Sequence, residues 1–251
     1  MLILLSPAKN MNETRGAGLA ASEPRLLDAA QELAGVARGW SEAEIAGIMQ
    51  VSPAIAALNA GRFAGWTRDG GLAAALTFDG DVYRDLDFAT LDEYAQRAAD
   101  RRLRILSGLY GLLRPLDAIH PYRLEMGRKL PGHPAGTLYR FWGARIAETI
   151  RADAAAAGTG TVLNLASEEY AKAVDRRALG DLAVVSPRFE EQRGETRKVI
   201  SFAAKRARGA MARWVLEEGI EDPADLQGFC VGGYAHDAEA STPGCPVFLR
   251  A

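Results

Sequence analysis

Three short apolar segments separated by helical patterns place the strongest constraint on the fold. Residues 1–6 (MLILLS), 103–107 (LRILS) and 161–167 (TVLNLAS) have the length and continuous apolarity of buried strands. Two further predicted strands, 181–189 and 197–202, are joined by the turn EEQRGE, which indicates a hairpin. Helix-separated strands together with one hairpin predict an α/β fold bordering on α+β, in which helices flank a mixed β-sheet.

Length and composition fit one compact domain over residues 1–251. The 251 residues are 48% hydrophobic and 25% charged, so the chain can bury a large core. The apolar N-terminal run lacks the basic flank of a signal peptide, and no later run approaches the ~20 residues of a membrane span. We therefore expect a cytoplasmic protein without a membrane partner.

The charge balance limits the classes of partner. The formal net charge is −2, which excludes a uniformly basic nucleic-acid binder. A locally basic cleft remains compatible with this balance, because net charge says nothing about where the charges gather.

Metal and redox chemistry have little support in the sequence. His120, His133 and His236 lie far apart, and no CxxC or HExxH spacing occurs. Cys230 and Cys245 are interpreted as free thiols, because a chain of this size needs no disulfide to fold. We expect no metal and no cofactor.

Residues 41–63 are predicted to form two helices joined by a very short connection. A capping-box pattern opens the first helix, and Ser52 followed by Pro53 opens the second. Helix-hairpin-helix modules bind DNA phosphates with backbone amides at such a position, and here Asn59 and Arg62 could reach a neighbouring phosphate. The hairpin lacks the glycines typical of these modules, so an ordinary pair of packed helices is the alternative.

A basic helix is predicted over residues 203–216. Its small apolar residues share one face, with Lys205 and Arg208 on one flank of that face and Arg206 and Arg213 on the other. Such a helix could line an anion-binding cleft with cations. The alternative is a solvated amphipathic helix whose long side chains cover the core.

The segment SGLYGLLRPLDAIHPYRLEMG, residues 107–127, directly follows a predicted strand. Gly108 and Gly111 fall where the chain leaves the sheet, which indicates a turn or a close approach of another segment. Pro115 and Pro121 restrict the residues before them to extended conformations and stiffen the loop.

Four charges in this loop suggest an anion site. Arg114 and Arg123 could point toward an anion while Asp117 and Glu125 orient them. Alternatively, the four charges pair with one another and the loop is purely structural.

Several separated strings together resemble one known family. MLILLSPAK, FDGDVY, LSGLYGLLRPLD, PYRLEMG, LYRFWG, VLNLASEEY and KRARGAM occur in this order over essentially the whole chain. They are similar to the bacterial YaaA family of peroxide-stress-resistance proteins. The resemblance implies a cytoplasmic α/β protein that supports survival of hydrogen peroxide, is associated with limiting free iron, and binds double-stranded or branched DNA through a basic cleft and a helix-hairpin-helix element.

The resemblance supplies no catalytic residues, so the site residues are inferred. Candidates for the DNA-binding cleft are Lys9, Asn59, Arg62, Arg114, Arg123, Lys172, Lys205, Arg206 and Arg208. Lysines and arginines would release counterions from DNA, giving little sequence preference and strong salt dependence. We expect a monomer to suffice.

An enzyme acting on a nucleobase or nucleotide, as a glycosylase does, is the competing hypothesis. Its candidate pocket residues are Tyr83, Tyr110, Tyr122, Glu125 and Asn164. This hypothesis predicts a closed pocket with a carboxylate of raised pKa, whereas simple DNA binding predicts an open basic trough. A third hypothesis, iron sequestration, is disfavoured by the scattered histidines and cysteines.

Overall fold

A five-stranded sheet forms the centre of the computed structural model, which describes residues 1–16, 19 and 22–251. The strand order is β11 (Ala183–Val185), β10 (Thr161–Asn164), β1 (Leu2–Leu5), β5 (Leu103–Ser107) and β6 (Gly111–Leu113). The first four strands are mutually parallel, and β6 returns antiparallel to β5. Every residue of β1 is buried, as continuous apolarity predicts for a central parallel strand.

A second, four-stranded sheet lies at one end of the molecule. Its order is β13 (Thr196–Lys198), β12 (Arg188–Arg193), β15 (Val247–Arg250) and β14 (Tyr234–His236). The predicted hairpin is present as β12–β13, but its bounds differ from the prediction. Residues 190–193 of the predicted turn belong to β12, and Ser201 and Phe202, predicted as strand, begin α10. The single strand predicted over residues 181–189 is wrong: it is two strands in different sheets, because the chain leaves the first sheet at Ser186–Pro187 and the N–H of Ser186 bonds the carbonyl of Gly244 instead.

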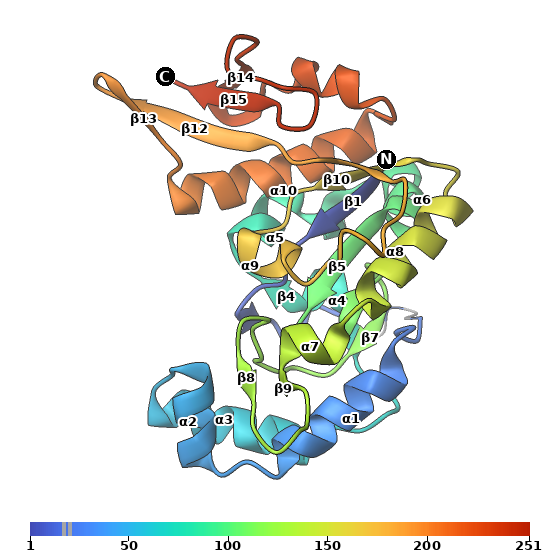
Figure 1. Cartoon of the computed structure of the whole chain (residues 1–251), viewed down its shortest axis with the longest axis vertical. Coiled ribbons are helices and arrows are strands. Elements are labelled where there is room, and N and C mark those ends of the chain that lie inside the picture. Colours follow the sequence, from blue (N-terminus) through green and yellow to red (C-terminus); the bar gives the residue numbers. More distant parts are fainter. Residues whose placement is uncertain (17–18, 20–21) are drawn as a thin grey trace.

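Helices surround both sheets (Figure 1). The longer ones are α1 (Leu27–Arg38), α2 (Glu42–Met49), α3 (Pro53–Ala64), α6 (Glu93–Arg102), α8 (Arg145–Ala156) and α10 (Ser201–Glu217). The short ones are α4 (Ala74–Thr77), α5 (Asp81–Leu86), α7 (Leu138–Trp142) and α9 (Glu168–Ala171). In Figure 1, α10 and the second sheet form one end of the molecule, α1 to α3 form the other, and the parallel sheet lies between them.

Minor elements complete this single mixed α/β domain. The two-residue strands are β2 (Asn10–Met11), β3 (Leu72–Ala73), β4 (Phe78–Asp79), β7 (Ala118–Ile119), β8 (Lys129–Leu130) and β9 (Gly136–Thr137). Short 3-10 helices span Phe88–Thr90, Pro223–Gly228 and Val231–Gly233. None of the helices in the described residues is long and apolar enough to cross a membrane.

The predicted helix pair at residues 41–63 is present as α2 and α3. The Ser41 hydroxyl accepts from the Glu44 N–H, Glu44 accepts from the Ser41 N–H at 2.8 Å, and the Ser52 hydroxyl caps α3. These caps explain why both helices begin where the sequence predicts. Whether the pair serves as a DNA-binding helix-hairpin-helix element stays a prediction.

Two glycines permit close backbone contacts that shape the molecule. A Cβ on Gly108 would lie 2.0 Å from the Leu124 carbonyl oxygen, so the expected close approach after β5 is confirmed. A Cβ on Gly209 would lie 2.0 Å from the Val82 carbonyl oxygen, which shows that α10 packs directly against the backbone of α5. Only glycine allows either contact without moving the neighbouring chain.

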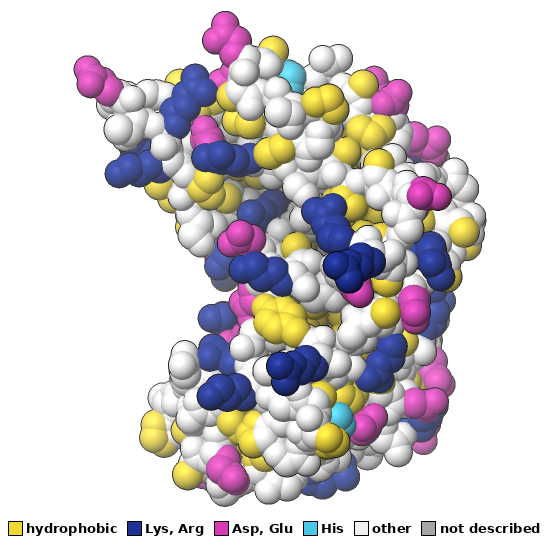
Figure 2. Space-filling model, viewed as in Figure 1, with side chains coloured by type: hydrophobic (Ala, Val, Ile, Leu, Met, Phe, Trp, Pro, Cys, Tyr) yellow, Lys and Arg dark blue, Asp and Glu magenta, His cyan; other side chains and the backbone are white. Residues whose placement is uncertain are grey.

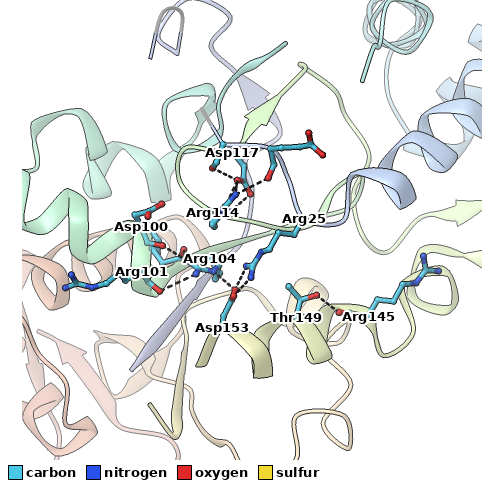
Figure 3. Close-up of polar contacts among 12 residues, drawn as sticks. Arg25, Asp100, Arg101, Arg104, Arg114, Asp117, Arg145, Thr149 and Asp153 are labelled. Atoms are coloured by element: carbon cyan, nitrogen blue, oxygen red, sulfur yellow. Dashed lines mark hydrogen bonds and ion pairs between the residues drawn. The ribbon is translucent and has the colours of Figure 1, made fainter. Parts of the chain in front are cut away.

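A buried ion-pair network ties α8 to β5 and to the segment before α1 (Figure 3). Both oxygens of Asp153 accept from the guanidinium of Arg25, and Oδ2 also accepts from Nε of Arg104 at 2.5 Å. Burial acts to raise the pKa of the Asp153 carboxyl, but the hydrogen bonds from Arg25 and Arg104 outweigh it and leave the pKa below its usual value.

We expect Gly209→Ala to lower the free energy of unfolding by about 1–3 kcal/mol, because the new methyl group must push α5 and α10 apart. Urea unfolding followed by circular dichroism measures this. Gly61→Ala in α3 is the matched control: open space surrounds its Cβ, and alanine should stabilise the helix by up to about 1 kcal/mol. Equal changes in the free energy of unfolding for Gly209→Ala and Gly61→Ala would contradict the close contact between α10 and α5.

We expect Asp153→Asn to destabilise the protein by about 3–5 kcal/mol at neutral pH, because the buried guanidinium of Arg104 and the more exposed one of Arg25 both lose their carboxylate. Since the folded pKa of Asp153 is lowered, its contribution is present above the unfolded pKa of about 4 and is lost as the pH falls through the folded value. The free energy of unfolding, measured from neutral to acidic pH, should therefore fall less steeply for the variant than for the wild type below about pH 4. Glu148→Gln, at an exposed position of the same helix, is the control, and an unchanged pH slope in Asp153→Asn would refute this role.

Candidate functional site

A cavity of about 250 Å³ lies at the carboxyl ends of β1 and β10, and we call it the central pocket. In parallel sheets, loops that leave neighbouring strands at this edge commonly form ligand sites. Segments from five parts of the chain line the pocket: residues 6–10, 79–83 and 122–125, the start of α9 with Leu165 before it, and the Lys205 and Arg208 side chains of α10.

Two serines join the ends of the parallel strands. Ser6 follows β1 and Ser167 precedes α9, and the Ser6 hydroxyl accepts from the Ser167 N–H at 2.8 Å while donating to its hydroxyl at 3.2 Å. The Tyr83 hydroxyl donates to the Ser6 carbonyl at 2.9 Å. The floor of the pocket is thus fixed by hydrogen bonds between segments that are far apart in sequence.

Tyrosine rings form apolar walls of the pocket. Tyr83, Tyr122 and Tyr170 are each at most 7% exposed and line it. The Tyr122 hydroxyl shares a 2.6 Å hydrogen bond with the hydroxyl of Ser107. Burial raises the pKa of all three hydroxyls, so the rings are neutral at physiological pH.

Tyr110, a candidate pocket residue, lies behind this wall. Its hydroxyl accepts from Nε1 of Trp66 and from the N–H of His120, both at 2.9 Å. Burial raises the pKa of Tyr110 to about 12. Tyr110 supports Tyr122 through an edge-on ring contact, with the ring centroids 5.6 Å apart.

Glu125 is the most buried acid of the pocket, with 5% exposure. Oε1 accepts from the guanidinium of Arg123 at 3.1 Å and lies 3.8 Å from the Lys9 ammonium, while Oε2 lies 3.5 Å from Nε of Arg128. Oε2 has no hydrogen-bond partner among the described residues. This carboxylate therefore holds a group of cations together, an arrangement that the nucleobase-enzyme hypothesis did not anticipate. That hypothesis stays untested.

Lys205 and Arg208 occupy the pocket flank of α10, as the helical pattern predicts. Lys205 is exposed and Arg208 is half-buried, and neither forms an ion pair within the part of the chain that the structure describes. Burial lowers the pKa of the Arg208 guanidinium, which nevertheless stays protonated because an arginine pKa is so high. A half-buried cation without a carboxylate partner favours an anionic ligand.

Arg206 lies on the opposite flank of α10. It makes two hydrogen bonds to Asp85, at 2.7 and 2.9 Å, and borders a separate cavity between α10 and the second sheet. Its charge is thus already matched by an acid.

Three other residues predicted to contact DNA already bind neighbouring groups within the protein. Asn59 is fully buried and its amide donates to the Ile55 carbonyl at 2.8 Å, so no phosphate can reach it in this structure. Arg62 pairs with Glu13 at 2.6 Å. Arg114 pairs with Asp117 at 2.9 Å, and burial, offset only in part by hydrogen bonds from Ser22 and Arg114, raises the pKa of Asp117.

Two further candidates lie outside the central pocket. Lys172 borders an open groove beside α7 and α9. The Asn164 amide donates to the Ser186 hydroxyl at 3.2 Å, and its oxygen accepts from the Ala166 N–H at 3.1 Å, so its polar groups serve the strand end.

The sequence reasoning missed Ser6, Glu169 and Arg128. The signal that could have found Ser6 is its position, because it ends the first apolar run as Ser167 ends the third. Glu169 accepts from the Gly127 N–H at 2.9 Å, which joins α9 to the 107–127 loop.

One side of the molecule is hollowed (Figure 2). In this view the molecule narrows between its two ends, on the side where Figure 1 places α5, α9 and β4, and Lys and Arg side chains lie along the hollow. Within the described residues there is no group of three or more His, Cys, Asp and Glu that could hold a metal ion.

We expect Glu125→Gln to lower the free energy of unfolding by about 1–3 kcal/mol, because Arg123 and Arg128 lose a buried partner. Thermal and urea unfolding measure the change. Lys9→Met should cost less than about 1 kcal/mol, since the Lys9 side chain is 64% exposed and its ion pair is solvated. If both variants matched the parent protein, Glu125 would not organise this cation group.

The chain matches a known family and has similar relatives over its whole length. The family model described as peroxide stress protein YaaA matches residues 1–240. A UPF0246 protein of Ruegeria sp. (strain TM1040) is 66% identical and one of Cereibacter sphaeroides (strain ATCC 17029) is 50% identical, each alignment covering 100% of both chains. A UPF0246 protein of Chromobacterium violaceum is 46% identical, over 100% of this chain and 99% of the relative. The chain therefore belongs to the peroxide stress protein YaaA family.

Proposed function

We propose that this protein acts in the peroxide stress response by binding duplex or branched DNA through the cationic side of the central pocket. The observation that carries the proposal is the pair Lys205 and Arg208, which face the pocket without an ion-pair partner among the described residues. Most other candidate cations are matched by acids, including Arg62, Arg114 and Arg206.

The charge distribution supports binding to the phosphate backbone. The net charge of −2 gives no general attraction to DNA, so binding requires a local concentration of cations. Lys205 and Arg208 supply it from α10. Lys9 and Arg123 border the same pocket but share the Glu125 carboxylate, so they add less. Contacts of this kind fix a protein on DNA without reading its sequence.

Family membership supports the physiological setting. Peroxide damages DNA through iron-dependent chemistry, and a protein that covers the duplex limits access of iron and peroxide to it. The proposed function is thus limitation of oxidative damage at bound DNA.

We expect Lys205→Ala and Arg208→Ala each to weaken DNA binding several-fold and to reduce the slope of log K against log salt by about 1. Fluorescence anisotropy with duplex and four-way junction DNA, between about 50 and 200 mM salt, measures both quantities. Arg206→Ala is the matched control on the same helix, since its guanidinium is already paired with Asp85.

Unchanged affinity and salt slope in both folded pocket variants would refute the proposal. A larger loss in Arg206→Ala than in Arg208→Ala would move the DNA surface to the other flank of α10.

A further inference from the structure

We propose that the central pocket receives a single nucleotide that has left the base stack of bound DNA. Its base would lie among the tyrosine and aliphatic walls, and its phosphate at Arg208 and Lys205. This inference rests on the proposed DNA binding and names the part of the DNA that enters the site.

The volume of the pocket limits the size of the ligand that it can hold. A cavity of about 250 Å³ lies below the range of about 300–1,000 Å³ that is typical of drug-sized ligands. A duplex, whose major groove alone is about 12 Å wide, cannot enter such a space. The space is thus far too small for a duplex and is closer to the size of a single nucleotide.

The walls suit a flat ring system. The hydroxyls of Tyr83 and Tyr122 are held by Ser6 and Ser107, so the rings themselves border the space. Leu165, Leu124 and Val82 add aliphatic surface. Phosphate binding alone needs no such wall, whereas flipped bases are held by aromatic and apolar side chains.

The cations lie where they can bind the phosphate of that nucleotide. Arg208 and Lys205 are three residues apart on α10 and thus share one helix face, and both line the same pocket as the tyrosines. Burial has already removed part of the water around Arg208, as its lowered pKa shows, so an anion beside it meets a weakly screened charge. Four acids also line the pocket, and each has a partner of its own. Glu125 pairs with Arg123, and Asp79 and Asp81 each lie 3.9 Å from the guanidinium of Arg84. Glu169 accepts from the Gly127 N–H.

A free mononucleotide offers the pocket the same base and phosphate as a nucleotide of bound DNA. The experiment therefore has one arm for each of these two ligands. The first arm uses a duplex with 2-aminopurine opposite an abasic site, because this base becomes brighter when it leaves the stack. We expect wild-type protein to raise the fluorescence several-fold at saturation. The second arm titrates free dAMP and follows its binding by calorimetry.

Variants that fill the pocket test its role. Ala8 lines the pocket, so Ala8→Phe adds bulk there, and Ala8→Ser is the size-matched control. We expect Ala8→Phe to abolish the fluorescence rise at protein concentrations that saturate the duplex, whereas Ala8→Ser keeps it. Asn10→Trp, at an exposed pocket position, gives the same test should Ala8→Phe not fold.

Each outcome decides between the hypotheses. Duplex binding without a fluorescence rise overturns this inference and leaves the proposed function intact, and binding of dAMP in that case assigns the pocket to a free nucleotide. A rise that persists in the pocket-filling variants also overturns it. Absence of any DNA binding overturns the proposed function itself.

Discussion

Parallel pairing of β1 with β10 on one side and with β5 on the other is the constraint on which the functional region depends. It registers Leu4 of β1 with Asn164 of β10 and with Arg104 of β5, so the loops that follow these strands leave the sheet at one edge. Ser6 and Ser167 meet there, and the hydrogen bonds between them fix the floor of the central pocket.

The pocket combines cations held by an acid with cations that have no ion-pair partner in the described part of the chain. Glu125 binds Arg123 and lies near Arg128, which fixes one wall electrostatically. Lys205 and Arg208 come from α10, whose close packing against α5 depends on Gly209. The fixed charges give the site its shape, and the free ones provide attraction for an anion, because a charge already paired with a carboxylate has little left to offer.

Sequence patterns predicted the elements better than the site. Continuous apolarity identified β1, β5 and β10, and cap residues located the starts of α2 and α3. The helical period placed Lys205 and Arg208 on one flank of α10 and Arg206 on the other, as observed. These successes have one cause: strand and helix periods, and caps, depend on residues close together in the chain.

The amino-acid sequence by itself determined the family, the mixed α/β class and the short elements, since these follow from local patterns and shared strings. Only the tertiary structure decided which charges are free. Asn59 and Arg62 lie one turn apart on α3, yet one is buried and the other pairs with Glu13. Arg208 lacks such a partner among the described residues. A charged side chain is matched by whichever acid the fold brings beside it, and sequence spacing does not encode that distance.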